Sequence, residues 1–410
     1  MRVQAKPDSD TVGRRRVFYI PGYDPFHPRR YRELYRKEGA AQAAISGYEL
    51  ALSPGQGEAG NGWDVAARFD RAEVGARVDV LVWSDIVRAS MAQGVIATYR
   101  QLARTVWVYV ASGAIFRLAR LRKGPAIAAF YPIGLLVLQM ALALGLVAAL
   151  FGLMTLVADG WLLRLCYAAA ALLAGWELLK WFKRKDNLLF AHYLMHDYAY
   201  TAQSGGANPP ELELRLAAFG NRIADALAED WDEVLVVGHS SGAHLAVSVL
   251  ADLIRAGRVP QCAPALGFLS LGHVVPMVSF LPGAGRLRGD LAYLSTREEV
   301  TWVDVTAPGD GCTYALCDPV LVSGLSPEGK RWPLIVSAAF TQTLSPARWK
   351  ALRWRFFRLH FQYLCAFDRP GDYDYFRITA GPKTLAARYR NRLPSQSRIE
   401  TARNPYRDIA

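Results

Sequence analysis

The residues best suited to chemistry form a pentad of the pattern G-x-S-x-G, Gly238-His239-Ser240-Ser241-Gly242. An apolar run over residues 233–240 predicts a strand leading into the pentad, and residues 241–257 predict a helix leading out of it. A serine on so sharp a turn is strained, and glycines two positions either side let neighbouring backbone approach closely. The Ser240 hydroxyl would then project above the sheet, where the helix N-terminus favours a developing oxyanion. We therefore expect a serine nucleophile; the alternative is a purely structural strand–turn–helix.

Other short apolar segments must form the sheet that carries this turn. Strands are predicted for VFYIPGY (17–23), YELALSP (48–54), DVLVWSD (79–85), ALGFLSLG (265–272) and VTWVDVT (300–306). Helices are predicted for residues 27–45 and 211–230. Strands separated by helical stretches predict an α/β fold with a mostly parallel, doubly wound sheet that is covered on both faces.

In this context the serine turn resembles the nucleophile elbow of the α/β-hydrolase superfamily of lipases and esterases. The order of elements from residue 17 to about residue 376 agrees with that family, apart from one apolar insertion. The resemblance implies a serine, then an acid after a later strand, then a histidine near the end of the sheet. It indicates no substrate-defining subfamily.

The acid implied by the resemblance falls in VTWVDVTAPGDGCTYALCDPV, which offers Asp304, Asp310 and Asp318. Asp310 lies in a Pro-Gly-Asp-Gly loop just after the strand, where its side chain can curl back toward the site. We expect Asp310 to be the acid and keep Asp304, within the strand, in reserve. The alternative for each is a turn aspartate that bonds its own backbone.

The histidine implied by the resemblance is His360, because no other histidine follows the acid in the chain. It would take the Ser240 proton and pass it to the leaving group. A partly buried structural histidine is the alternative for His360, and His273 is the reserve base. His239 and His244 flank the elbow, and we expect them to shape the pocket.

An oxyanion hole needs two backbone N–H donors, and the family pattern takes one of them from the residue after the nucleophile, here Ser241. The other would be Gly22 or Tyr23, in the IPGYDP loop after the first strand. A plain strand-ending turn is the alternative for that loop.

An apolar hairpin interrupts the α/β pattern. Residues 126–158 carry no charge, the turn Asp159-Gly160 follows, and residues 161–182 are again apolar. Each segment is long enough to cross a bilayer core, so we expect two transmembrane helices rather than a buried helical pair. Small residues at 167–175 allow close packing, within the hairpin or between chains of a homo-oligomer.

Charge sets the expected location of the protein. Lys and Arg residues precede and follow the hairpin, whereas its turn carries only Asp159. The positive-inside rule then places both flanks and the catalytic region in the cytoplasm, in a two-pass membrane protein of the bacterial inner-membrane type. The net charge of +12 favours contact with anionic lipid, since no nucleic-acid motif is present. Five scattered cysteines and a polar N-terminus favour a reducing compartment without a secretory signal.

Several weaker patterns leave alternatives open. Residues 88–121 predict either a helix on the membrane surface or an amphipathic helix against the sheet. His192 and Asp197 have the H-x4-D spacing of glycerolipid acyltransferases, and His192 and His196 could share a metal, but the favoured interpretation is that these aromatic and histidine residues anchor the end of the second apolar helix at the interface. Residues 347–360 interleave arginines with aromatic residues and predict an amphipathic helix, a lipid-headgroup contact or a nucleic-acid contact. We expect no nucleic acid, metal or other cofactor.

These expectations divide the chain into six parts: a flexible N-terminal arm (1–16), the first part of the hydrolase domain (17–87), an interfacial helical region (88–125), the transmembrane hairpin (126–185), the second part of the hydrolase domain (186–385) and a C-terminal tail (386–410). The expected activity is hydrolysis of a carboxylic ester, from a lipid or acyl substrate, through an acyl-enzyme. Acyl transfer by the same triad and a non-catalytic membrane scaffold are the alternatives.

Overall fold

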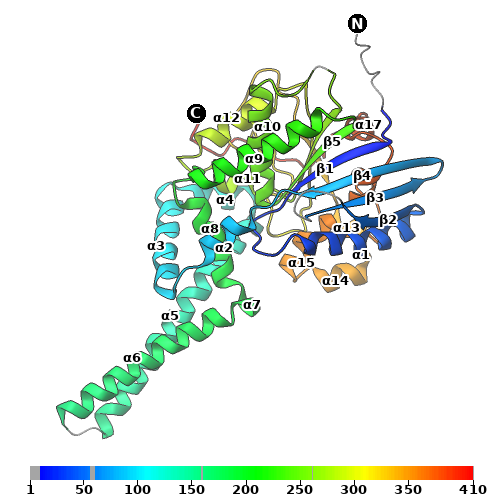
Figure 1. The fold of residues 1–410 in the computed structure, drawn as a ribbon. Coiled ribbons are helices and arrows are strands. Elements are labelled where there is room, and N and C mark those ends of the chain that lie inside the picture. Colours follow the sequence, from blue (N-terminus) through cyan, green and yellow to red (C-terminus); the bar gives the residue numbers. More distant parts are fainter. Residues whose placement is uncertain (1–9, 56–60, 158–159, 261, 410) are drawn as a thin grey trace.

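The protein is built on one mixed β-sheet beside a long helical hairpin (Figure 1). The computed structural model describes residues 10–55, 61–157, 160–260 and 262–409. The strands are β1 Arg14–Ile20, β2 Glu49–Pro54, β3 Gly62–Phe69, β4 Ala72–Val80, β5 Glu233–His239, β6 Ala265–Leu271, β7 Thr301–Thr306 and β8 Leu334–Ser337. They lie in the order β2-β3-β4-β1-β5-β6-β7-β8.

The sheet is parallel from β4 across to β8, whereas β3 runs antiparallel to both of its neighbours, β2 and β4. The expected α/β class is therefore confirmed, and the sheet is mixed rather than purely parallel. Every residue of β5 is buried, as expected for a central strand covered on both faces. Along β3, buried and more exposed residues alternate, which is typical of a sheet flank with one open face.

Helices cover both faces of the sheet and extend beyond it. The helices before β5 are α1 Arg29–Ser46, α2 Ser84–Met91, α3 Val95–Ala111, α4 Ala114–Leu121, α5 Lys123–Val157, α6 Trp161–Arg184, α7 Asp186–Leu189, α8 Ala191–Ala202 and α9 Pro210–Leu227. Those after β5 are α10 Ser241–Arg255, α11 Val275–Ser279, α12 Gly285–Leu294, α13 Phe340–Thr343, α14 Pro346–Leu352, α15 Phe356–His360, α16 Tyr375–Ala380 and α17 Leu385–Tyr389. A 3₁₀ turn, Phe361–Leu364, continues α15.

Two separate apolar cores result from this layering. One face of the sheet packs against α1, α16 and α17, and the other packs against α9, α10 and α12. Tyr31 and Tyr35 of α1 lie in the first core, and Leu250 and Leu253 of α10 lie in the second. The carboxyl ends of the central strands therefore form a rigid edge between two helical layers.

The structure corrects several predicted element boundaries. β1 begins at Arg14, inside the predicted flexible arm of residues 1–16, and buried Arg15 pairs with Glu233 at 2.6 Å. Residues 1–9 of that arm lie outside the described residues. The strand predicted for residues 79–85 is wrong beyond Val80, because the strand is β4 and the chain turns into α2 at Ser84.

The hairpin projects from the body of the protein as α5 and α6, which lie side by side (Figure 1). Both helices are long and apolar enough to cross a membrane, and only 17% of the most apolar window of each is buried. The alternative of a helical pair buried inside the protein is therefore wrong. Gly175 packs within the hairpin, since a Cβ there would lie 2.6 Å from Cγ2 of Val147. Asp159 of the turn lies outside the described residues.

The helical region before the hairpin is not one long helix. α3 and α4 bend by 73° and pack on the end of the body, where the Tyr109 hydroxyl donates to the Met277 carbonyl at 3.0 Å. Their outer faces leave Ile96, Trp107 and Phe116 exposed. These helices thus cover the region around α8 and α11 rather than the sheet itself.

Candidate active site

Ser240 occupies a strained turn between β5 and α10. Its φ is 57° and its ψ is −122°, a backbone conformation that residues other than glycine rarely adopt. The Ser240 N–H donates to the Leu271 carbonyl at 2.9 Å, which fixes the turn to the end of β6. The strained conformation predicted for this serine is confirmed.

The glycines two positions either side of Ser240 have no room for a side chain. A Cβ on Gly238 would lie 2.6 Å from the Gly242 carbonyl oxygen, and a Cβ on Gly242 would lie 2.1 Å from the Ile20 carbonyl oxygen. Real Cβ atoms do not approach backbone so closely. The spacing G-x-S-x-G is therefore a steric requirement of the contact between β1, β5 and α10.

The loop after β1 passes directly over the serine. A Cβ on Gly22 would lie 2.9 Å from the Ser240 Cβ and 3.4 Å from its Oγ. Within the described chain, the N–H groups of Gly22 and Tyr23 have no hydrogen-bond acceptor. Ser241 begins α10, and the first N–H groups of a helix have no partner inside the helix. Of the three predicted oxyanion donors, Gly22 therefore lies against Ser240, and Tyr23 and Ser241 are the chain neighbours of Gly22 and Ser240.

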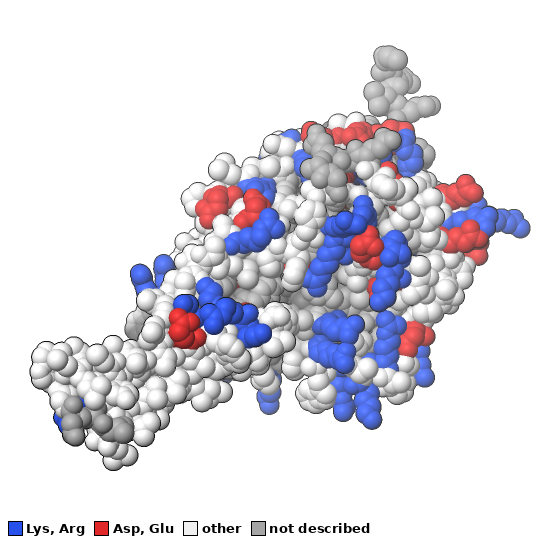
Figure 2. Space-filling model, turned by 60° about the horizontal axis from the view of Figure 1, so that its bottom comes forward, with Lys and Arg blue, Asp and Glu red and all other residues white. Residues whose placement is uncertain are grey.

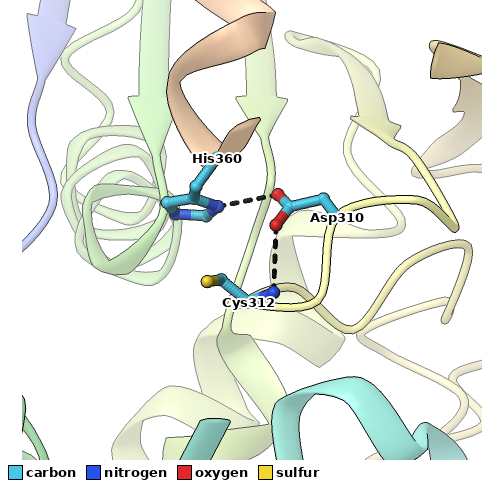
Figure 3. Close-up of side chains that lie close together, drawn as sticks. All are labelled: Asp310, Cys312 and His360. Carbon is cyan, nitrogen blue, oxygen red and sulfur yellow. Dashed lines mark hydrogen bonds and ion pairs between the residues drawn. The ribbon is translucent and has the colours of Figure 1, made fainter. Parts of the chain in front are cut away.

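His360 and Asp310 are joined by a hydrogen bond, although 50 residues separate them in the chain. Nδ1 of His360 lies 2.7 Å from Oδ2 of Asp310, and both side chains are buried (Figure 3). The loop after β7 supplies Asp310, and its other carboxylate oxygen accepts the Cys312 N–H at 2.9 Å. A histidine bonded in this way is held in one orientation with Nε2 free to accept a proton.

Contacts around His360 place it at the same edge of the sheet as Ser240. The His360 carbonyl is 3.0 Å from Nε2 of His239, the residue that precedes Ser240. The rings of His239 and His360 are 4.9 Å apart. A Cβ on Gly272, just after β6, would lie 3.2 Å from Cε1 of His360. His360 therefore stands at the carboxyl ends of β5 and β6.

The other acids and the reserve histidine are engaged elsewhere. The Asp304 carboxylate accepts the Ser270 hydroxyl at 2.5 Å, and burial raises its pKa well above the ordinary value. Asp318 pairs with Lys330 at 2.7 Å. His273 is fully buried, with Nε2 3.1 Å from the Cys317 carbonyl.

The two histidines beside the elbow are buried and neutral. Burial, together with the charge of the nearby His360, lowers the pKa of His239 to about 3. Burial also lowers the pKa of His244 to about 4. Neither ring has the hydrogen bond to Asp310 that orients His360. Both rings form part of the surroundings of Ser240.

Three neighbouring side chains around the His360–Asp310 pair could offer ligand atoms to a metal. Asp310, Cys312 and His360 each present one such atom, and these atoms lie within 4.8 Å of one another (Figure 3). Burial raises the pKa of the Cys312 thiol, with Asp310 contributing in the same direction, so the metal-binding thiolate is disfavoured. The hydrogen bond between His360 and Asp310 is sufficient to explain why these three side chains lie close together.

Asp197 is a site residue that sequence reasoning missed. The sequence placed it only in the spacing His192-x4-Asp197, yet in the structure it lines a pocket with Tyr23 and Ser241. Burial raises its pKa to about 7, and the charge of His360 acts in the opposite direction. His192 and His196 lie on the same helix, and among the described residues their ring nitrogens have no hydrogen-bond partners. No local pattern marks Asp197, because α8 reaches the site only through tertiary packing.

A basic and aromatic surface adjoins the site. The helix predicted for residues 347–360 is broken into α14 and α15, and Trp354 between them is 73% exposed. Exposed cations surround Trp354, namely Lys350, Arg353, Arg355 and Arg358. Figure 2 shows Lys and Arg side chains gathered on the underside of the body, and at the base of the hairpin. The rest of the hairpin is almost free of charged side chains.

Comparison with protein-family models, with curated proteins and with solved structures finds no match to this chain.

Proposed function

We propose that this protein is a serine hydrolase of the α/β-hydrolase type that cleaves a carboxylic ester. The observation that carries the proposal is the Asp310–His360 hydrogen bond at the same sheet edge as the strained Ser240. A serine hydroxyl is a weak nucleophile unless an adjacent base takes its proton, and such a base needs a partner that holds its orientation.

The proposed reaction proceeds through an acyl-enzyme. Ser240 Oγ attacks the ester carbonyl while its proton moves to Nε2 of His360, and Asp310 stabilises the resulting imidazolium. The N–H groups of Ser241 and of Gly22 or Tyr23 bind the oxyanion of the tetrahedral intermediate. His360 then protonates the departing alcohol, and water releases the acyl group by the same steps in reverse order.

We further propose that α5 and α6 anchor the enzyme in a membrane, with the body on the cytoplasmic side. Support comes from the apolar length of both helices and from the basic residues that flank them, including Lys183, Arg184 and Lys185. Anchoring beside the basic underside fits a lipid or long-chain acyl substrate. A C-terminal green fluorescent protein fusion should fluoresce and a C-terminal alkaline phosphatase fusion should be inactive; the reverse result would contradict this orientation.

Fluorophosphonate labelling of the detergent-solubilised full chain tests the catalytic proposal. We expect the wild type to label, Ser240→Ala not to label, and His360→Ala to label at least about 100-fold more slowly, because general-base catalysis contributes about 10²–10⁴. Exposed residues provide the matched controls Ser397→Ala and His27→Ala, which should label like the wild type.

The proposal fails if the wild-type protein, monodisperse and folded, does not react with the probe. It also fails if Ser240→Ala labels as fast as the wild type. The first result would favour a non-catalytic scaffold on the same fold, and the second would mean that a residue other than Ser240 is the reactive nucleophile.

A further inference from the structure

A cavity of about 540 Å³ lies at the amino ends of β7 and β8, at the opposite edge of the sheet from Ser240. Thr301, the first residue of β7, and Leu334, the first residue of β8, both line it. Its other walls include the loop 330–333, α17 and the chain that follows α17. Small-molecule sites usually have volumes of about 300–1,000 Å³, so this cavity is large enough for a small organic ligand.

Cations dominate the charged groups of this cavity. The described residues that line it include five cations, namely Lys330, Arg331, Arg390, Arg392 and Arg398. They include two carboxylates, those of Asp318 and Glu400. Arg331, Arg390 and Arg392 pair with carboxylates that lie outside the lining. The wall of the cavity therefore has an excess of positive charge, which favours an anionic ligand.

Three of these arginines keep N–H groups for a ligand. Arg392 and Arg398 each donate from Nε to a carboxylate and from Nη1 to a backbone carbonyl, and Arg331 donates from Nη2 to a carboxylate. Among the described residues, Nη2 of Arg392, Nη2 of Arg398 and Nη1 of Arg331 have no acceptor. A guanidinium group with free N–H donors matches the oxygen atoms of a phosphate.

The ion pairs that these arginines already form do not close the cavity to an anion. Glu298, the partner of Arg331, is 78% exposed, and Asp372, the partner of Arg392, is 45% exposed. Exposed ion pairs contribute little to stability, so an incoming anion can share or replace these carboxylates at small cost. Lys330 is held more firmly, because its Nζ lies 2.7 Å from the buried carboxylate of Asp318.

Aromatic and apolar side chains complete the lining. Trp332 and Tyr389 contribute aromatic surface, and Pro333 and Pro394 contribute apolar surface. The indole N–H of Trp332 donates to the Arg297 carbonyl at 2.9 Å, which fixes the ring in place. Such a lining favours a ligand with an organic part beside its charged groups.

The cavity lies away from the proposed membrane anchor. Figure 1 shows α17, which forms one of its walls, on the opposite side of the body from α5 and α6. Headgroups of the bilayer that the hairpin would cross are therefore remote from these arginines. A ligand for this cavity has to be a soluble molecule.

We propose that this cavity binds a soluble organic phosphate with more than one negative charge. Arg331, Arg392 and Arg398 bind its phosphate groups, and its organic part lies against Trp332 and Tyr389. The site is separate from Ser240, so the inference does not depend on the proposed hydrolase activity.

Isothermal titration calorimetry of the full chain in a zwitterionic detergent tests the inference. The probes are adenosine triphosphate, tripolyphosphate and adenosine, with EDTA present to remove divalent cations. We expect adenosine triphosphate to bind with a Kd below about 0.1 mM and adenosine to give no measurable binding. Tripolyphosphate should bind more weakly than adenosine triphosphate, because it has no ring to contact Trp332 and Tyr389.

Arg392→Gln and Arg398→Gln should each weaken the binding of adenosine triphosphate at least about tenfold, since hydrogen bonds to a charged group are strong. Arg36→Gln is the matched control. Arg36 forms an exposed ion pair with Glu33 at 3.0 Å on α1 and does not line the cavity. This variant should bind adenosine triphosphate within about twofold of the wild type. Melting temperatures measured on the same samples show whether each variant is folded.

Three results would overturn the inference. The first is a folded wild type that binds neither phosphate. The second is an equal loss of affinity in Arg36→Gln and Arg392→Gln, which would mean unspecific attraction to a chain of net charge +12. The third is tripolyphosphate binding at least as tightly as adenosine triphosphate, which would exclude a contact with the organic part.

The same titration in nanodiscs distinguishes a soluble ligand from a lipid headgroup. Adenosine triphosphate should bind equally well in nanodiscs of phosphatidylcholine and of phosphatidylglycerol. Loss of binding in phosphatidylglycerol would mean that its headgroups occupy the cavity, and would contradict a soluble ligand. Ser240→Ala should bind adenosine triphosphate like the wild type, so calorimetry and fluorophosphonate labelling test the two proposals separately.

Discussion

Replacing Gly22 by alanine tests whether the loop after β1 forms part of the catalytic site. The added Cβ would lie 2.9 Å from the Ser240 Cβ, 3.3 Å from the His239 carbonyl oxygen and 3.4 Å from the Ser240 Oγ. Contacts of this kind are relieved only by moving the loop or the serine, and overpacking of one methyl group costs about 1–3 kcal/mol. Because moving the loop displaces a proposed oxyanion donor, and loss of one such donor slows catalysis about 10²–10³-fold, we expect labelling to slow by at least about tenfold.

The assay is the rate of fluorophosphonate labelling, with the melting temperature measured on the same samples. Gly220→Ala is the matched control, because nothing lies within 4 Å of a Cβ built at this position of α9. In a helix interior alanine is favoured over glycine by about 1 kcal/mol, so this control should label normally and melt no earlier than the wild type. A folded Gly22→Ala protein that labels within about twofold of the wild type would refute the placement of Gly22 against the reacting serine.

Two further predictions concern the acidic residues. Asp310→Asn should slow labelling by about 10²–10⁴, because an amide cannot stabilise the His360 imidazolium. Asp304→Asn should label normally, since Asp304 bonds Ser270 instead. Equal effects of the two changes on labelling would contradict the assignment of Asp310 as the acid. The raised pKa of Asp197, about 7 against 3.8, means that the folded state keeps a proton that the unfolded state loses, so this residue lowers stability as pH rises between these values, by at most about 4 kcal/mol. Asp197→Asn should therefore melt like the wild type near pH 4 and at a higher temperature at pH 8, and a difference in melting temperature that does not grow with pH would contradict the cited shift.

The serine turn could be predicted because its requirements are local. The apolar run of β5, the helix start at Ser241 and the two glycines are all contiguous in sequence, and the contacts of Gly238 and Gly242 explain why no other residue fits. His360 could be chosen by chain order alone. Its pairing with Asp310 rather than Asp304 depends on how the loop after β7 folds back, which the sequence indicates only through its Pro-Gly-Asp-Gly turn.

The missed elements have different causes. β3 alternates buried and exposed positions and continues through a turn at Asp70, so its signal was present in the sequence. The apolar run of residues 79–85 continues beyond β4, so the strand predicted from it extends past the true end of β4. β8 has only four residues and follows a proline, too short for any periodicity to appear. The start of β1 is not evident from the sequence, because Arg15 is charged. A buried arginine in a strand can be recognised only once its partner, Glu233, is known.

The hairpin is inserted in the chain next to residues that lie beside the proposed nucleophile. The chain leaves the sheet at the end of β4 and returns at β5, and everything between, including α5 and α6, is one insertion at the carboxyl edge. Trp83 lies where this insertion begins, and Asp197 and Tyr200 lie on α8, where the chain has just come back from the hairpin. α8 packs on α5 through Leu136 and Met195. The packing of α8 on α5 therefore links the orientation of the hairpin to the position of Asp197 and Tyr200 beside Ser241, so a change at this packing should alter both.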